Sequence, residues 1–198
     1  VLGAKEFAQR HNYSVLLRIS DFREEEERAG LQMLTQQQVD AIIIALWSGD
    51  ALFTELRTLF QQDYPIVCMT SCDDVDTVIV EPRSGERQII EHLAALGHRR
   101  IGYIYGVADQ QVFSTRLHYC LAFQQEMGIP VEEQWVYRCG PTLEDGYRAC
   151  RELLMNSTDE QRPTALVVVN NLLSSSVYGA IHDAHLRIPQ DISVVSFD

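Results

Sequence analysis

Short apolar runs alternate with amphipathic stretches almost from one end of the chain to the other. Residues 41–46 (AIIIAL) and 165–169 (ALVVV) are apolar on both faces, which is typical of buried parallel strands. Amphipathic stretches of about a dozen residues, such as 143–155, predict helices instead. Strands that alternate with helices in this way predict an α/β fold with parallel sheets flanked by helices.

The same alternation predicts the other elements. Further strands are expected at residues 13–19, 65–69, 77–80, 101–105, 135–137 and 192–197. Further helices are expected within residues 1–12 and at residues 23–38, 50–60, 85–96, 114–127 and 172–185. Glycine often ends a helix, and Gly97 and Gly128 end two of these.

The number of strand–helix units is too large for one small sheet. A turn-rich stretch at residues 71–76 also breaks the rhythm. We therefore expect two lobes, residues 1–80 and residues 81–198, with the boundary near residues 81–84. Because the chain opens inside a helix and stops on a strand ending at Asp198, we also expect a leading strand and a C-terminal segment to be missing.

Charge narrows the possible partners. The net charge is -12, with 16 Lys and Arg against 28 Asp and Glu. Affinity for nucleic acid comes largely from cations that contact phosphates, so this surface disfavours DNA binding. Any DNA contact is expected to come from a segment outside this chain. No apolar run approaches the roughly 18–20 residues of a membrane helix, so no membrane partner is predicted.

The five cysteines are odd in number and include no C-x-x-C pair. This usage favours free, mostly buried thiols in a reducing cytoplasm over disulfides. It predicts no metal site.

Ligands of open parallel sheets sit outside the carboxyl ends of the strands. Here these positions are Ser20, Asp21, Trp47, Ser48, Thr70, Ser71, residues 106–116, residues 140–142, Asn170, Asn171 and Asp198. Polar hydrogen-bonding side chains with some aromatic surface suit a neutral polyol or sugar.

Several of these residues allow two interpretations. Arg116 begins a predicted helix, where a cation is unfavourable for the helix dipole, so it either meets an outside anion or a cluster of hydroxyls, or makes a surface salt bridge. Asn171 is expected to cap the next helix, whereas Asn170 is either a cap or a ligand contact. Asp198 is either an acceptor that faces the ligand or a turn residue.

Enzyme motifs are absent from the sequence. There is no G-x-S-x-G, no P-loop, no H-E-x-x-H and no G-x-G-x-x-G. His182 and His185 share a helix face but lie away from the strand ends, and the run of glutamates at 24–27 predicts a solvated helix face. We therefore expect no enzyme activity, no cofactor and no metal.

Some stretches resemble a known family. Residues 92–103 (HLAALGHRRIGY), 188–198 (IPQDISVVSFD), 38–44 (QVDAIII) and 12–17 (NYSVLL) resemble characteristic stretches of the lac/gal repressor (LacI/GalR) family of transcription regulators. Arg116 stands twelve residues before Gly128, as the effector-binding arginine of that family does. The resemblance covers essentially the whole chain.

The resemblance implies a two-lobed, periplasmic-binding-protein-like core that binds a small sugar-like effector between its lobes. It implies a cytoplasmic homodimer whose operator DNA is held by a helix-turn-helix domain not present in this chain. The effector would contact Arg116, Asn170 and Asp198, and Thr70 from the other lobe; Trp47, at a strand end, completes the candidate set.

Four positions depart from the family pattern. Thr70 and Asn171 stand where aspartates are usual, and Ser196 and Tyr119 stand where glycines are usual. Loss of the two carboxylates puts a standard hexose effector in doubt.

Two other function classes remain open at this stage. A periplasmic sugar-binding protein of a transporter has the same architecture, but the odd cysteine count and the family stretches favour the regulator. An α/β hydrolase or transferase is disfavoured because its nucleophile motif is absent.

Overall fold

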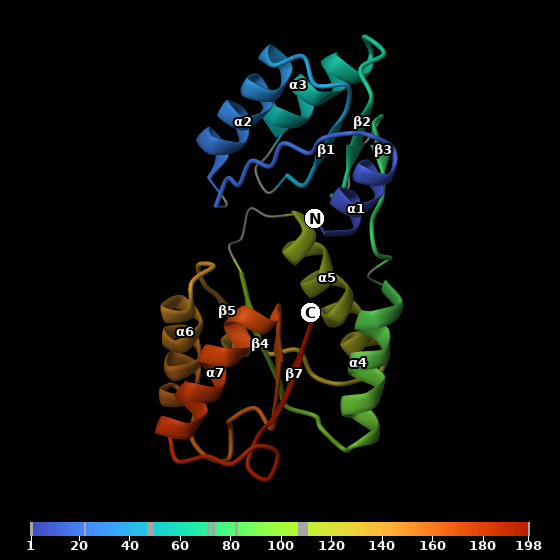
Figure 1. The fold of residues 1–198 in the computed structure, drawn as a ribbon. Coiled ribbons are helices and arrows are strands. Elements are labelled where there is room, and N and C mark those ends of the chain that lie inside the picture. The colour runs from blue at the N-terminus through green and yellow to red at the C-terminus, as the bar shows by residue number, and fades with distance from the viewer. Residues whose placement is uncertain are drawn as a thin grey trace. The chain divides into compact units, whose positions relative to one another are not determined.

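The computed structural model describes residues 2–21, 23–46, 50–70, 72, 74–81, 83–106 and 111–197 (Figure 1). The chain divides into two compact units, Val1–Val78 and Ile79–Asp198. Each unit contains a sheet whose described strands all run parallel. The predicted α/β class, with parallel sheets flanked by helices, is therefore confirmed.

The first unit contains a three-stranded sheet in the order β1-β2-β3. Its elements are α1 (Leu2–Arg10), α2 (Glu24–Gln36), β1 (Ile42–Ile44), α3 (Asp50–Phe60), β2 (Ile66–Cys68) and β3 (Asp76–Thr77). Ile42 and Ile66 belong to one buried cluster with Leu31 of α2 and Leu56 of α3. Ile43, which points to the opposite face, is 61% exposed. One face of this sheet is thus buried against α2 and α3.

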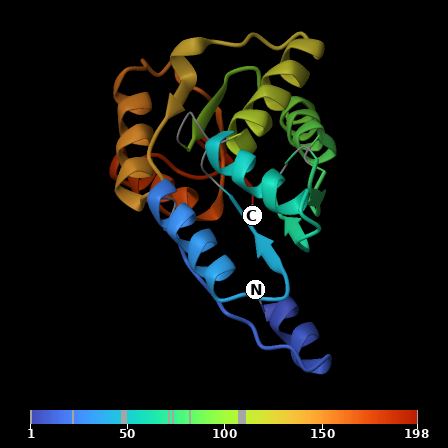
Figure 2. The same cartoon turned by 90° about the horizontal axis from the view of Figure 1, so that it is seen from above.

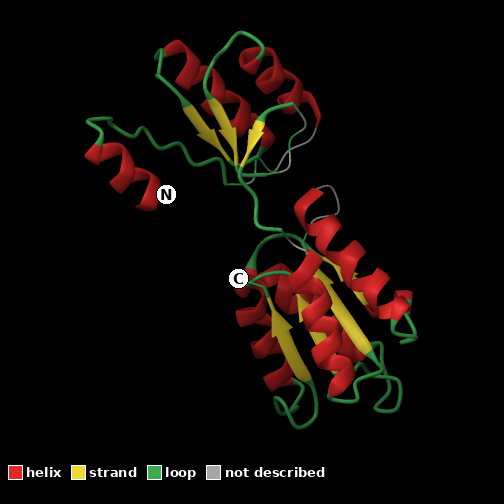
Figure 3. Ribbon diagram, turned by 90° about the vertical axis from the view of Figure 1, so that its right-hand side faces the viewer, coloured by secondary structure: helices red, strands yellow, loops and turns green. Residues whose placement is uncertain are grey.

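Residues 13–19 do not form the strand that their pattern predicts. They run as an extended segment without strand pairing (Figure 3). Leu17 and Ile19 in this segment are 60% and 66% exposed. The segment passes beside α2 (Figure 2). Arg18 of this segment pairs with Glu26 of α2 at 2.5 Å and lies close over Gly30. The prediction fails because a strand needs a neighbouring backbone, and no described strand bonds to this segment.

The strand predicted at residues 77–80 is also different in the structure. Only Asp76–Thr77 pair with β2, and the amide of Val78 adds one bond to the Cys68 carbonyl at 2.9 Å. Val80 is 87% exposed, so the apolar run here does not mark burial.

The second unit contains a four-stranded sheet in the order β5-β4-β6-β7. Its elements are α4 (Arg83–Ala95), β4 (Ile101–Tyr105), α5 (Gln111–Glu126), a 3-10 turn (Glu133–Trp135), β5 (Val136–Arg138), α6 (Leu143–Met155), β6 (Ala165–Val168), α7 (Asn171–Asp183) and β7 (Ser193–Ser196). Helices α4 and α5 lie on one side of the sheet and α6 and α7 on the other (Figure 1). Every residue of β4 and β6 is buried, as two covered faces require.

Candidate functional site

Arg116 lies at the carboxyl ends of β6 and β7. Its Nη1 donates a hydrogen bond to the carbonyl of Val169 at 3.3 Å, and its Cζ lies 4.8 Å from the ring centroid of Phe197. Val169 directly follows β6, and Phe197 directly follows β7, where its amide still bonds to the Val168 carbonyl at 3.3 Å. The guanidinium therefore sits at the edge of the sheet where open parallel sheets bind ligands.

A buried carboxylate, Glu86, lies behind Arg116. Its side chain is 1% exposed, and its Oε1 is 3.8 Å from Nε of Arg116. Its other oxygen, Oε2, is buried and has no hydrogen-bond partner among the described residues. Burial raises the pKa of Glu86. A hydrogen bond from its own backbone amide and the charge of Arg116 partly oppose this shift.

Sequence reasoning missed Glu86. An acidic residue in the first turn of a helix looks like an ordinary favourable partner of the helix dipole. The available signal was its position, four and seven residues before Ile90 and Leu93, the two buried apolar residues of α4. A carboxylate on that face of the helix is a buried carboxylate.

The polar groups beneath Arg116 and Glu86 are neutral. The hydroxyl of Tyr105 lies 3.7 Å from Sγ of Cys120, and both side chains are buried. Burial raises the pKa of Cys120 to about 12, so it remains a thiol at neutral pH and is not an activated nucleophile. Burial likewise raises the pKa of Tyr105 well above its ordinary value. This arrangement favours binding over acid–base or nucleophilic chemistry.

Asn170, and not Asn171, caps α7. Asn170 has an extended backbone (φ -158, ψ 168), and its side chain accepts a hydrogen bond from the amide of Leu173 at 2.9 Å. Asn171 is the first residue of the helix, and its side-chain oxygen lies 3.4 Å from the hydroxyl of Ser196. The expectation that Asn171 is the cap is wrong, because only a residue with extended backbone turns its side chain over the first helical amides.

Thr70 belongs to the first unit and is 7% exposed. Its hydroxyl accepts a hydrogen bond from the amide of Leu46 at 3.4 Å and lies 3.2 Å from Sγ of Cys68. It therefore ties together the residues that follow β1 and β2. Of the other candidates, Trp47 and Asp198 lie outside the described residues. Within the second unit, Arg116 bonds to the residue that precedes Asn170, so these two candidates share one strand end.

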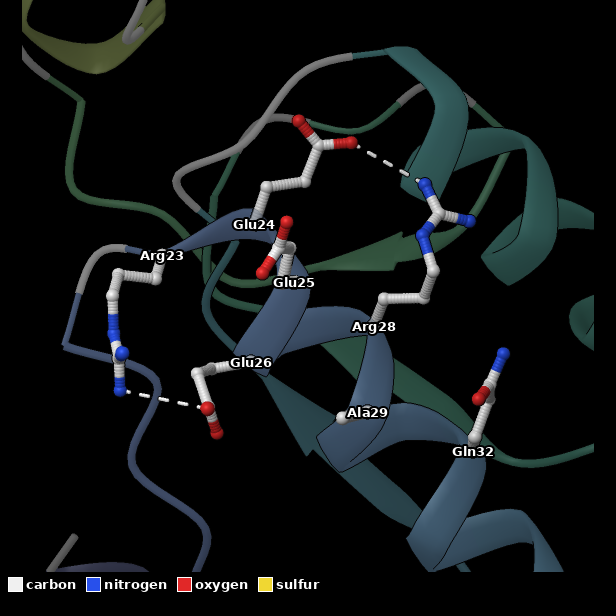
Figure 4. A pocket seen from close by; sticks show the side chains of 7 residues that line it. All are labelled: Arg23, Glu24, Glu25, Glu26, Arg28, Ala29 and Gln32. Atoms are coloured by element: carbon white, nitrogen blue, oxygen red, sulfur yellow. Dashed lines mark hydrogen bonds and ion pairs between the residues drawn. The ribbon is translucent and has the colours of Figure 1, made fainter.

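A hollow of about 660 Å³ lies over the start of α2 (Figure 4). It is lined by Arg23, Glu24, Glu25, Glu26, Arg28, Ala29 and Gln32. All of these belong to one helix and the residue before it, and ion pairs of 3.3 Å (Arg28–Glu24) and 3.5 Å (Arg23–Glu26) join them. No strand end contributes, so we assign this hollow no ligand. The expected solvated face is exposed at Glu24 and Glu25, but Glu27 is buried, contrary to that expectation.

Within the described ranges, no three His, Cys, Asp or Glu side chains come together as metal ligands. None of the five cysteines forms a disulfide; Cys139 is partly buried, whereas the other four are buried. Among the described helices, none combines the length and the hydropathy that a membrane span requires.

The chain is similar to one protein-family model and to known transcriptional repressors. Residues 90–198 match the family model described as a periplasmic binding protein-like domain. The chain is 27% identical over 200 residues to the HTH-type transcriptional repressor PurR of Haemophilus influenzae (strain PittEE), covering 99% of this chain and 58% of that protein. It is 31% identical over 180 residues to PurR of Pectobacterium carotovorum (strain PC1), covering 87% of this chain and 51% of that protein.

The fold is also found in solved structures. A regulatory protein of the LacI family from Chloroflexus aggregans matches with a TM-score of 0.81 and 26% identity, covering 98% of this chain and 72% of that one. The chain spans little more than half the length of the curated relatives that it matches.

Proposed function

Because this chain belongs to the family of periplasmic binding protein-like domains and forms an effector-binding core of the LacI/GalR type, we propose that it senses a small molecule for a transcription regulator. The relatives reported above are named as repressors and as a regulatory protein, which favours regulation over the transport alternative. We further propose that the effector is a small, sugar-like molecule and that Arg116 is its principal contact.

The geometry of Arg116 carries this proposal. Its guanidinium has five N–H donors, of which one bonds to Val169, while Nη2 has no hydrogen-bond partner in the described part of the chain. The side chain is 22% exposed, so part of the guanidinium is accessible. A ligand with adjacent hydroxyl or carbonyl oxygens could accept two parallel bonds from it. The ring of Phe197 next to it offers the apolar surface that a sugar face needs.

Asn170 is the second proposed contact. Its Oδ1 is used in the helix cap, but its amide N–H₂ group can still donate to an effector at the end of β6. Thr70, Trp47 and Asp198 complete the proposed set. Because the hydroxyl of Thr70 already bonds within the first unit, we expect Thr70 to contribute less than Arg116.

DNA binding is proposed for a helix-turn-helix segment outside these 198 residues. The net charge of -12 supports this division, since such a surface repels phosphates. The matched repressors are named as HTH-type. Effector would change DNA affinity only if it binds two conformations of the core differently. A homodimer in the cytoplasm completes the proposal, and five cysteines without a disulfide support a reducing compartment.

The test is a ligand screen with a matched pair of variants. Purified protein is screened by thermal shift against sugars, sugar phosphates, sugar acids and nucleosides, because a ligand of the native state raises the melting temperature. Affinity for a hit is then measured by calorimetry in Arg116→Ala and in Arg148→Ala, whose side chain is 61% exposed and pairs with Asp145. We expect Arg116→Ala to lose about 10- to 100-fold in affinity, as for a lost hydrogen bond to a charged group. Unchanged affinity in Arg116→Ala would refute the site.

A further inference from the structure

The buried carboxylate behind Arg116 is not explained by effector binding alone. Glu86 is 1% exposed, and its Oε2 has no hydrogen-bond partner in the described structure. Burying a carboxylate is costly unless an opposite charge or hydrogen bonds compensate it. A buried carboxylate with this cost suggests a role in the site.

Arg116 is the cation that compensates Glu86. Two groups of the second unit that lie close enough to influence Glu86, Tyr105 of β4 and Cys120 of α5, are uncharged because burial raises the pKa of each. Glu81, just before α4, is anionic and acts against the ionised form of Glu86. The Arg116 guanidinium, with Nε 3.8 Å from Oε1, is therefore the favourable charge that this carboxylate faces in the described part of the unit.

We propose that Glu86 determines which class of effector the site accepts: it positions Arg116 and offsets its charge, so that Arg116 binds an uncharged hydroxyl or carbonyl group in preference to a carboxylate or phosphate. The inference rests on the proposed function, in which Arg116 faces the effector.

Coulomb's law shows why a counter-charge selects against anions. An anion in contact with the free edge of the guanidinium is roughly twice as far from Glu86 as from Arg116, so repulsion by Glu86 cancels about half of the attraction. Glu86 weakens the binding of a neutral acceptor to Arg116 far less, because the hydrogen bonds of a neutral acceptor depend on the local N–H dipoles and on their direction. The fixed orientation of Arg116, held by Glu86, Val169 and Phe197, favours the neutral ligand further.

Inorganic sulfate is the probe, because it tests anion binding without knowledge of the effector. Its affinity is measured by calorimetry at pH 7.5 for the wild type, Glu86→Gln and the matched control Glu91→Gln. Glu91 lies on the same helix and is 51% exposed, and it pairs with Arg87 at 3.7 Å, so its replacement makes the same change in net charge. We expect sulfate to bind Glu86→Gln about tenfold more tightly than the wild type or Glu91→Gln.

The double variant Glu86→Gln/Arg116→Ala shows where sulfate binds. Loss of the tenfold gain in the double variant supports the inference. A gain that persists there overturns it, because sulfate then binds away from Arg116. Equal sulfate affinity in Glu86→Gln and the wild type also overturns it. The proposed function is tested separately, by whether Arg116→Ala loses affinity for the neutral ligand found in the screen.

A pH series on the wild type supplies a second measurement that needs no mutation. Because burial raises the pKa of Glu86, this carboxyl takes up a proton at a higher pH than an exposed glutamate. Sulfate affinity should therefore rise as the pH falls through that pKa, while Glu86→Gln should lack this component and Glu91→Gln should keep it. A purely structural role for Glu86 predicts that the three profiles run parallel, and that result would refute the inference.

Discussion

Replacement of Asn170 by alanine is expected to destabilise the second unit by about 1 kcal/mol. The first amides of α7 have no acceptor within the helix, and the Asn170 side chain accepts from one of them, Leu173 N, at 2.9 Å. Alanine removes this acceptor without changing the backbone. The loss of about 1 kcal/mol lowers the folding equilibrium constant by about fivefold.

The assay is urea unfolding without ligand, followed by tryptophan fluorescence. Trp135 belongs to the second unit and is 6% exposed, so its emission reports on that unit. A Trp47→Phe background removes the other tryptophan of the chain. With a slope of about 2 kcal/mol per molar urea, the midpoint should fall by about 0.5 M.

Two neighbouring substitutions make the prediction specific. Asn170→Ser keeps a side-chain oxygen for the cap and should cost only a few tenths of a kcal/mol. Asn171→Ala leaves the cap intact and gains helix propensity but loses the 3.4 Å contact with the Ser196 hydroxyl, so its midpoint should fall less than that of Asn170→Ala. If Asn171→Ala loses stability and Asn170→Ala does not, the assignment of the cap is wrong. Equal losses in Asn170→Ser and Asn170→Ala would show that the hydrogen bond is not the cause.

Three further predictions concern packing, acid stability and thiol reactivity. Gly146→Ala should cost about 1 kcal/mol net in urea unfolding despite its better helix propensity. The new Cβ would lie 2.5 Å from the Ser176 hydroxyl, 3.0 Å from the side chain of Leu173 and 3.4 Å from the backbone of Leu173. Unchanged stability would mean that α6 and α7 pack less closely. Hydrogen bonds from Thr142 lower the pKa of Asp145, so its stabilising effect is complete above the unfolded pKa and is lost as the pH falls through the folded pKa. The stability of Asp145→Asn should thus depend less on pH below about pH 4 than that of the wild type, and identical acid unfolding curves would contradict this. Cys139 is the least buried thiol, and burial raises its pKa to about 11. It should react first with an aromatic disulfide reagent, in a fast phase that Cys139→Ser removes. A fast phase that remains in Cys139→Ser would contradict this prediction.

Local patterns were sufficient to place most elements of the second unit. Every position of its central strands is buried because both faces of the sheet are covered, and the apolar runs in the sequence predict this burial directly. The ends of two helices could also be predicted from the local sequence. Gly97 and Gly128 have positive φ values of 87 and 66, which glycine adopts without steric cost, and a helix stop there needs no tertiary contact.

Residues 13–19 show where such patterns fail. Their composition is that of a strand, yet a strand is defined by the backbone it pairs with, and that neighbour is not a local property. The same reasoning applies to Asn170 and Asn171, which are chemically identical. Only the backbone angles of the folded chain decide which of the two amides points over the start of α7.

The sequence by itself determined the alternation of strands and helices, the strand ends where ligands bind, the acidic surface and, through its family resemblance, the candidate Arg116. The tertiary structure alone decided what surrounds that arginine. Glu86, Val169 and Phe197 come from three separate parts of the chain and meet at Arg116 only because α4 and α5 pack together beside the ends of β6 and β7. Burial and charge compensation depend on these distant contacts, and no local pattern encodes them.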